Sequence, residues 1–391
     1  MNKIYLDNSA TTITDEAAVK AMLPYFSDIY GNPSSFHSFG RQAKKALEDA
    51  RIKTARLINA KADEIIFTAC GTESDNIAIF GTVNAFGKKC HLIATKIEHH
   101  AVLYSFKELE KRGFAVTYLS VDKNGVISLD ELKKSIREDT LLVSIMHANN
   151  EVGSLQPIEK AAKIISVLNK ERRDKIYFHT DAVQTSGKIS VNVQTLGVDL
   201  LAMSAHKFNG PKGVGALYIR SGVNISPIIF GGHHENNMRP GTENIAYAVG
   251  LAKALELSVD SMAQNSQKIK IIKEKLQDGI IKRIPDITIN GNSETSISNV
   301  LNISFNYIEG ESLLAKLDMA GIAVSTGSAC ASGSSEPSHV LSAMGIDPIA
   351  AQGAIRFSFG HHNTEEEIDY VLDVLPKIVE DLRKMSPLYK R

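Results

Sequence analysis

The segment Ser204-Ala205-His206-Lys207 combines a lysine with a hydroxyl and an imidazole at one predicted strand end. The apolar run 198–203 before it predicts a buried strand, and the glycine-rich segment GPKG follows closely. Burial beside other cations lowers the pKa of a lysine and frees a nucleophilic amine. Ser204 and His206 can hold a phosphate beside that amine. The segment therefore suits a Schiff base between Lys207 and a phosphorylated aldehyde cofactor, although a single lysine here is more often a solvated surface residue.

The turn Ala69-Cys70-Gly71-Thr72-Glu73 lies between a predicted strand and a predicted helix. A Gly-Thr turn that opens a helix presents backbone N–H groups and a hydroxyl to an anion such as phosphate. The alternative is an ordinary helix N-cap, in which Thr72 or Ser74 satisfies those donors.

Asp181 ends the predicted strand KIYFHTDA, and Gln184 follows it. A carboxylate in apolar surroundings needs a partner, and a protonated pyridine nitrogen would supply one. That ion pair would keep the ring cationic and make it an electron sink. A helix N-cap role for Asp181 is the alternative.

Three further side chains suit chemistry on an amino acid. His99 follows another strand end, where it would either lie on the cofactor ring and transfer protons or be an ordinary buried histidine. Cys330 lies in the loop STGSACASGSS, where a mobile thiol would either do chemistry in the site or be a bystander. Arg356 lies inside an apolar strand and needs a carboxylate, either a structural one or the α-carboxylate of a substrate.

The composition excludes several other classes of function. The 44 basic and 44 acidic residues give a net charge of +0, so neither a nucleic-acid surface nor a membrane surface is predicted. The three cysteines are too widely spaced for a disulfide framework or a zinc site, and Cys70 and Cys90 are interpreted as small buried side chains. Paired histidines such as His99-His100 match no metal motif, so we expect no metal. The N-terminal sequence has no secretion core and no apolar run approaches a membrane span, which favours a cytoplasmic location.

Apolar strand-like runs alternate with helical patterns in the first two thirds of the chain. This alternation predicts an α/β fold with a mostly parallel sheet flanked by helices, whose ligands bind at the carboxyl ends of the strands. The expected strands are 64–68, 91–96, 115–121, 141–146, 176–180, 200–204 and 215–219, and the expected helices are 74–86, 102–112, 129–137 and 158–170.

The last third of the chain has a different pattern. A long helical pattern over 244–280, broken near 260–264, is followed by short strands (300–305, 322–325, 355–359) and helices (311–319, 365–385). The 391 residues are enough for two domains. We expect a large domain over 15–255, and a smaller α+β domain formed by 1–14 and 256–391 that carries the Cys330 loop.

Taken together, these motifs resemble cysteine desulfurases of the NifS/IscS type, in the class V branch of fold-type I pyridoxal-phosphate (PLP) enzymes. The resemblance covers essentially the whole chain and depends on the order and number of the motifs. They are YLDNSATT, GNPSSFHSFG, GTESDN, IEHHAVL, NNEVGSLQPI, DAVQTSGK, SAHKFNGPKGVGALYIR, GTENI, VSTGSACASGSSEPSHVL and RFSFG.

The resemblance implies a role for each candidate residue. Lys207 would carry PLP, Asp181 would pair with the ring nitrogen, and Gln184 would contact the ring hydroxyl. His99 would stack on the ring, and Cys330 would be the nucleophile that accepts sulfur. The phosphate would be held by Gly71, Thr72, Ser204 and His206, with Thr242 from the partner subunit of a homodimer, and the substrate carboxylate by Asn150 and Arg356.

The implied reaction converts L-cysteine to L-alanine and leaves sulfur on Cys330 as a persulfide. The sulfur would then pass to acceptor proteins such as an iron–sulfur scaffold, or toward tRNA thiolation. Two departures from the family pattern, Cys70 before Gly71 and His233 in place of a glycine, remove no catalytic group. A selenocysteine lyase, a class V aminotransferase and a non-catalytic scaffold are the alternatives, but the last would need neither Lys207 nor Asp181.

Overall fold

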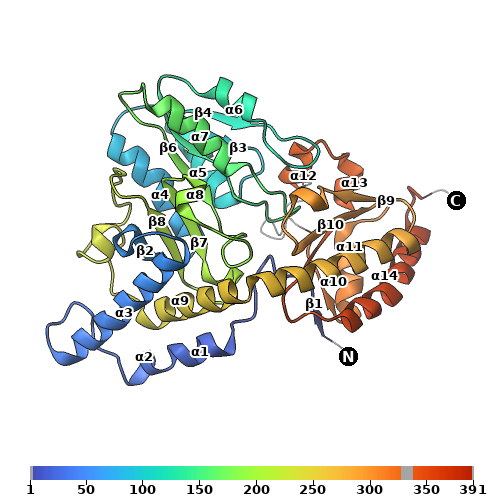
Figure 1. The fold of residues 1–391 in the computed structure, drawn as a ribbon. Helices are drawn as coiled ribbons and strands as arrows, with labels where there is room; N and C mark the ends of the chain where they lie inside the picture. The colour runs from blue at the N-terminus through green and yellow to red at the C-terminus, as the bar shows by residue number, and fades with distance from the viewer. Residues whose placement is uncertain (1–2, 327–337, 390–391) are drawn as a thin grey trace.

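The larger part of the molecule is built on one seven-stranded sheet. The computed structural model describes residues 3–326 and 338–389 (Figure 1). The strands lie in the order β2-β8-β7-β6-β5-β3-β4. They are β2 (Ile65–Thr68), β3 (His91–Thr95), β4 (Ala115–Leu119), β5 (Thr140–Ser144), β6 (Tyr177–Asp181), β7 (Leu200–Ser204) and β8 (Gly215–Ile219). Strands β4, β3, β5, β6 and β7 pair in parallel, and β8 is antiparallel to both β7 and β2. The prediction of a mostly parallel α/β fold is therefore confirmed.

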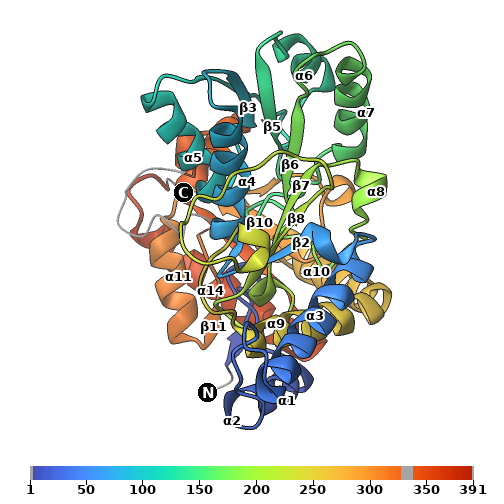
Figure 2. The same cartoon turned by 90° about the vertical axis from the view of Figure 1, so that its left-hand side faces the viewer.

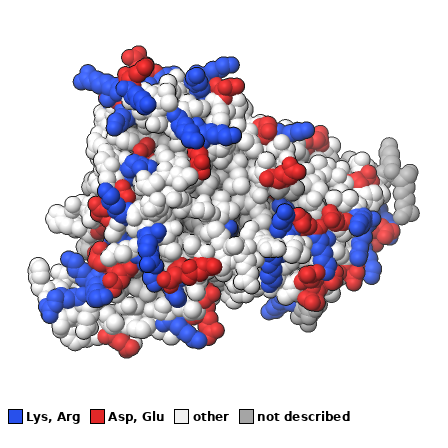
Figure 3. All heavy atoms as spheres, viewed as in Figure 1, with Lys and Arg blue, Asp and Glu red and all other residues white. Residues whose placement is uncertain are grey.

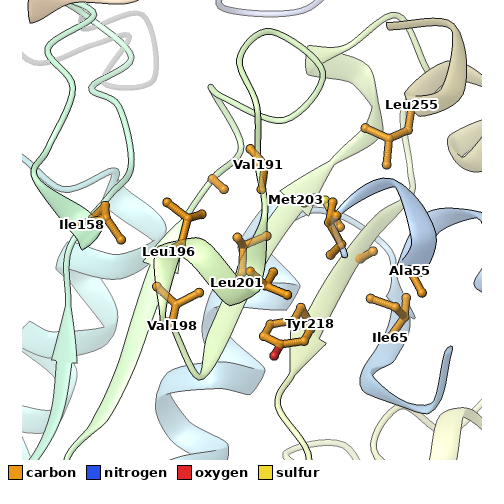
Figure 4. Packing of buried hydrophobic residues seen from close by; sticks show 14 of the residues in the cluster. Ala55, Ile65, Ile158, Val191, Leu196, Val198, Leu201, Met203, Tyr218 and Leu255 are labelled. Carbon is orange, nitrogen blue, oxygen red and sulfur yellow. The ribbon is translucent and has the colours of Figure 1, made fainter. Parts of the chain in front are cut away.

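Helices cover both faces of this sheet, because neighbouring residues of each buried strand point to opposite faces. Leu92 of β3 packs with α4 (Gly71–Phe86) and α5 (His100–Lys111), whereas Ile93 packs in the core on the other face. Figure 2 shows α4 and α5 on one side of the sheet and α6 (Leu129–Ser135), α7 (Ile158–Asn169) and α8 (Val193–Leu196) on the other. Figure 4 is a close view of the core that contains Ile93, in which Leu201, Met203 and Tyr218 belong to the same cluster as Ala55 and Leu255.

The C-terminal third forms a separate core around a second sheet. Its strands β12 (Ala354–Ser358), β10 (Val300–Phe305) and β9 (Ile287–Asn290) are antiparallel. The helices α10 (Met262–Arg283), α11 (Gly310–Met319) and α14 (Glu365–Met385) pack their apolar residues on it (Figure 1). Helix α14 begins with a capping box between Thr364 and Glu367, which satisfies the first backbone donors. The expected domain boundary near 255 falls within α9 (Ile245–Asp260) and stays a prediction.

The N-terminal segment connects the two sheets. Strand β1 (Ile4–Tyr5) pairs in parallel with β11 (Ile322–Ala323), and the backbone N–H of Asn8 then donates to Ser358 O at 3.2 Å. Four residues later, Thr12 contacts the large sheet, because its N–H and its hydroxyl both donate to His206 O at 2.9 Å. Residues 9 and 10 therefore lie beside the end of β7.

Several elements had no strong sequence signal. Helix α3 (Ser38–Leu57), α1 (Glu16–Met22) and α2 (Pro24–Ser27) were not predicted, nor were α12 (His339–Ala343) and α13 (Pro348–Gln352). The buried face of α3 is made largely of small alanine side chains: Ala43, Ala46, Ala50 and Ala55. Tertiary packing on α9 holds this helix in place.

On the face shown in Figure 3, basic and acidic side chains are interspersed and form no large patch of one sign. None of the helices within the described ranges is long and apolar enough to cross a membrane.

Candidate active site

A cavity of about 260 Å³ lies at the carboxyl ends of the parallel strands. Its wall contains ten of the residues that the sequence singled out: Gly71, Thr72, His99, Asn150, Asp181, Gln184, Ser204, His206, Lys207 and Arg356. They come together because parallel strands end at the same edge of a sheet. The sequence predicted this for the residues that follow strands of the large sheet, whereas Arg356 reaches the cavity from β12 of a second sheet.

The start of α4 forms an anion cradle in this wall. The helix begins at Gly71, three residues earlier than predicted, and its N-cap Cys70 makes no side-chain capping bond. The first-turn N–H groups are therefore not capped by a side chain and are available to a ligand. A Cβ at residue 71 would lie 2.7 Å from Val183 Cγ2, so only glycine lets the backbone approach so closely. Across from it, Ser204 Oγ is buried without a hydrogen-bond partner in the described chain.

Lys207 is held at the cavity by the N-terminal segment. It lies in a single 3₁₀ turn after β7, and its Nζ donates to Ser9 O at 2.6 Å and to Ala10 O at 2.7 Å. Next to it, Nδ1 of His206 lies 3.1 Å from Thr11 Oγ1. Burial, together with the charge of Lys207, lowers the pKa of His206 to about 4, so this imidazole is neutral.

Asp181 lies at the end of β6 and is 5% exposed. Its Oδ1 accepts the N–H of Val183 at 2.8 Å. Burial raises its pKa to about 6, against the opposing effects of that hydrogen bond and of Lys207. A cationic partner would relieve the cost of burying this carboxylate, which is the chemistry of a protonated ring nitrogen.

Gln184 lies one turn beyond Asp181 and is fixed at both ends of its amide. Its Nε2 donates to Ser9 O at 3.1 Å, and its Oε1 accepts Lys188 Nζ at 3.1 Å. Burial and the charges of Lys207 and Arg356 lower the pKa of Lys188 to about 7.

His99 is the N-cap of α5. Its Nδ1 accepts the N–H of Ala101 at 3.1 Å, so the neutral ring carries its proton on Nε2. Burial, and after it the charge of Lys207, lowers its pKa to about 4. The helix-capping alternative is thus present in the structure, together with a place in the cavity wall.

Arg356 of β12 is 3% exposed and has a structural carboxylate partner. Its Nη2 donates to Asp7 Oδ1 at 2.7 Å, and its Nη1 donates to the backbone O of Asn150 at 3.0 Å. The Nε is buried and unpaired within the described chain. One donor therefore stays available to a second carboxylate, so the two alternatives for Arg356 are compatible.

The remaining predicted residues have different outcomes. Thr242 is exposed and is not in the cavity wall. Cys330 lies outside the described residues. Cys90 is buried as predicted, with its pKa raised to about 11 by burial, whereas Cys70 is only half-buried and lines the cavity. Within residues 3–326 and 338–389, no group of three or more His, Cys, Asp or Glu side chains could hold a metal ion.

The sequence reasoning missed three parts of the wall. Ser9 and Ala10 line the cavity and belong to the motif YLDNSATT, but the sequence analysis gave their backbone carbonyls no role. Asp75 was given no role, although a carboxyl one turn after Gly71 is a signal that could have marked it.

The fold and this wall define a class of protein: a PLP-dependent enzyme built on a mostly parallel sheet. The unpaired Ser204 hydroxyl and the glycine cradle fit the phosphate, Asp181 fits the ring nitrogen, and Lys207 fits the aldehyde. A family model described as "Aminotransferase class-V" matches residues 4–371, and the chain belongs to this family.

Curated relatives of the chain are named cysteine desulfurases. The chain is 51% identical over 390 residues to the cysteine desulfurase IscS of Dictyoglomus turgidum, covering 100% of this chain and 97% of that protein. It is 48% identical over 386 residues to the IscS of Methanosarcina thermophila, covering 98% and 94%. Among solved structures, a NifS-like protein aligns with a TM-score of 0.91 at 42% identity, covering 97% of this chain and all of the other. The structure described as SspA in complex with cysteine aligns with a TM-score of 0.81 at 33% identity, covering 93% and 100%.

Proposed function

We propose that this protein is a cysteine desulfurase that converts L-cysteine to L-alanine and transfers the sulfur to its own Cys330. In this reaction the substrate C–S bond breaks, an S–S bond forms to the Cys330 thiol, and the products are alanine and a persulfide. The proposal depends on one observation: an amine, a buried carboxylate and a buried guanidinium (Lys207, Asp181 and Arg356) line one cavity. The cysteine desulfurase relatives, similar over the full chain, support the choice of substrate.

Arg356 binds and orients the substrate carboxylate. Its two Nη groups are fixed by Asp7 and Asn150, so the guanidinium plane is set before the substrate arrives. The Nε, unpaired within the described residues, would then be the donor for the substrate carboxylate, with Asn150 in the same wall. Preorganisation of this kind reduces the entropic cost of orienting the reacting bond.

Lys207 would hold the PLP aldehyde through its amine, and the same amine, once free, would take the α-proton of the substrate. The bound PLP ring supplies the electron sink, which its ring nitrogen provides only while protonated. Asp181 would hold that proton at the ring nitrogen, and Gln184 would contact the ring hydroxyl through the amide that Lys188 and Ser9 orient. The carbonyls of Ser9 and Ala10 would hold the amine while it is free during a turnover.

His99 lines the cavity where the ring would lie, and its neutral imidazole holds a proton at Nε2. Because Nδ1 is occupied by the Ala101 N–H, this histidine is set up to donate from Nε2. A neutral imidazole stacked on a cationic ring also avoids charge repulsion, which its lowered pKa ensures. We propose that His99 supplies and recovers the proton exchanged between the substrate sulfur and the Cys330 thiol.

We further propose that the protein acts as a homodimer in which Thr242 of each chain completes the phosphate site of the other. Thr242 is exposed and outside its own cavity wall, so a role at the phosphate needs a second copy. Large exposed apolar side chains support such an interface. They lie along α1, α2 and the start of α3 and in the segment before Thr242: Leu23, Phe26, Phe36, Phe39 and Phe230. Sedimentation at micromolar concentration would find a dimer, and a monomer with full PLP affinity would remove Thr242 from the site.

We propose that the chain divides into a large domain (15–255) and a small domain (1–14 and 256–391). We also propose that the protein is located in the cytoplasm. We propose that the persulfide sulfur passes to acceptor proteins for iron–sulfur cluster assembly or tRNA thiolation. The IscS names of the relatives support the first of these.

The test of Cys330 is a single turnover with ³⁵S-labelled L-cysteine, followed by non-reducing peptide mapping. The label is expected on the peptide that contains Cys330 and is released by a thiol. The variant Cys330→Ala should keep PLP and bind cysteine but lose the label. Cys90→Ala, which removes a buried thiol far from the cavity wall, is the matched control and should keep it. Full labelling of Cys330→Ala, or labelling at Cys70 instead, would contradict the assignment.

A further inference from the structure

A chain of buried polar side chains runs directly behind Asp181. Asp75, 1% exposed, lies in the second turn of α4, and His179, fully buried, precedes Asp181 by two residues on β6. His179 and Asp181 therefore point to the same face of the sheet, which α4 covers. His179 Nε2 lies 3.4 Å from Asp75 Oδ1, and His179 Nδ1 lies 2.8 Å from Ser144 Oγ. Asp75 also lines the cavity that holds Asp181.

The two facing atoms have no other partner. Among the described residues, neither Asp75 Oδ1 nor His179 Nε2 forms a hydrogen bond. A buried polar atom left unpaired costs about 1–3 kcal/mol, and the two atoms are only a few tenths of an ångström beyond hydrogen-bond length. One proton between them satisfies both.

The charges around the pair decide which atom owns that proton. Apart from His179 itself, the titratable groups that act on Asp75 are acidic: Asp181 from β6, Glu98 from the segment after β3, and Cys70 at the start of α4. Burial, followed by these neighbours, raises the pKa of Asp75 well above its ordinary range. Burial alone lowers the pKa of His179 to about 3. Each side chain is thus neutral, with the carboxylic acid as donor and Nε2 as acceptor.

This placement fixes the rest of the chain. With Nε2 accepting, the neutral ring of His179 carries its own proton on Nδ1 and donates to Ser144 Oγ. Two carboxylates in one wall repel each other when both are ionised, so one of them holds a proton. With the proton on Asp75, Asp181 remains as the ionised carboxylate toward the ring.

We propose that Asp75 is a positioning residue: as a neutral carboxylic acid it donates to His179 Nε2, and this neutral pair keeps Asp181 ionised and directed at the cofactor ring nitrogen. The inference rests on the proposed role of Asp181. Without the acid, Nε2 of His179 would be an unpaired acceptor two residues from Asp181. That unpaired acceptor would leave the buried polar chain behind Asp181 incomplete, and the direction of the Asp181 carboxylate toward the ring nitrogen would no longer be fixed.

Three variants of the full-length protein separate this role from a merely structural one. Asp75→Asn keeps a neutral donor of the same shape, so the PLP dissociation constant should stay within about threefold of wild type. Asp75→Ala removes the donor and should weaken PLP binding about tenfold. Asp75→Ala/His179→Leu also removes the unpaired acceptor and should recover most of that affinity. A double variant no better than Asp75→Ala would overturn the coupling to His179.

A second readout does not depend on cofactor affinity. Infrared difference spectra of ¹³C-aspartate-labelled protein should show a protonated carboxyl band at neutral pH in wild type that is absent in Asp75→Asn. The pH midpoint of the visible absorbance of bound PLP should be the same in these two proteins. If Asp75 were ionised, the band would be missing and Asp75→Asn would shift that midpoint by about one unit or more. Either result would overturn the proposal.

Asp181→Asn keeps the two hypotheses distinguishable. This variant should lose at least tenfold in PLP affinity if Asp181 pairs with the ring nitrogen. Normal PLP affinity in Asp181→Asn would refute the proposed role of Asp181. Weak PLP binding in both Asp181→Asn and Asp75→Asn would refute only the neutral pair.

Discussion

The Arg356 Nη2 atom lies 2.7 Å from Asp7 Oδ1, although 349 residues separate the two in the sequence. With the bond from Arg356 Nη1 to Asn150 O, this ion pair joins the small sheet, the N-terminal segment and the loop after β5 at the cavity. A buried guanidinium, with one nitrogen unpaired among the described residues, is thereby fixed in the cavity wall, where we propose that the substrate carboxylate binds.

The first prediction concerns this guanidinium. Arg356→Lys should raise the KM for L-cysteine by at least about tenfold, because an ammonium cannot keep both fixed contacts and still present a planar fork. Steady-state kinetics of sulfide release measure it. Arg283→Lys, at an exposed ion pair with Asp373, is the matched control and should leave KM unchanged. An unchanged KM in Arg356→Lys would remove Arg356 from the substrate site.

The second prediction concerns the Schiff base. After borohydride reduction of the holoenzyme, mass spectrometry should place the PLP adduct on the peptide that contains residue 207. Lys207→Ala should lose the adduct, and its turnover should fall by a factor of about 10²–10⁴, the usual contribution of a general acid–base group. Lys212→Ala, whose amine donates to Thr12 O in the same segment, should keep the adduct. An adduct on any other lysine would contradict the site.

The third prediction is a pH dependence of stability at Glu98. This fully buried carboxyl accepts Thr95 Oγ1 and the Met146 N–H, and burial raises its pKa to about 8. Between its unfolded pKa and about 8, the folded state binds the extra proton, so the stabilisation from Glu98 is complete below pH 4.5 and is lost as the pH rises through 8.

Glu98→Gln removes this titration and keeps a neutral amide in its place. Its free energy of unfolding relative to wild type should therefore rise between pH 5 and pH 8, by on the order of 2–4 kcal/mol. Urea unfolding at several pH values measures the difference. The exposed Glu171→Gln is the control and should show a flat difference. A flat profile for Glu98→Gln would mean that Glu98 is ionised in the folded protein.

The fourth prediction concerns a buried ion pair between α3 and the segment before Thr242. Both Arg51 and Glu235 are buried, and their side chains form two parallel bonds of 2.6 and 2.8 Å. Glu235→Gln should cost about 3–5 kcal/mol of stability, because it leaves the Arg51 charge buried without compensation. Thermal and urea unfolding should show the loss. Asp49→Asn, at an exposed pair with Lys45, should cost less than about 1 kcal/mol. Similar losses in the two variants would show that the Arg51–Glu235 pair contributes little.

The sequence was sufficient to predict residues whose position follows from a strand end. Asp181, Ser204 and Lys207 end or follow buried strands, and the parallel sheet brings such ends to one edge. The predicted strands of this sheet agree with the observed ones to within two residues, because their runs of branched and aliphatic residues are continuous.

Contacts that depend on tertiary packing could not be predicted in the same way. No local pattern shows that Asp7 reaches Arg356, or that the carbonyls of Ser9 and Ala10 hold the Lys207 amine. Asp75 belongs to a helix that buries residues around most of its circumference, so an isolated carboxylate on it gives no amphipathic signal.

The central claim is desulfurase chemistry, and the most direct measurement is the stoichiometry of products. Purified protein with bound PLP is given L-cysteine and a reducing thiol, without any keto acid, and sulfide and alanine are measured over time. We predict equal amounts of sulfide and alanine over many turnovers. If neither alanine nor sulfide forms without a keto acid, and adding a keto acid restores turnover, the protein is an aminotransferase and the desulfurase assignment is contradicted.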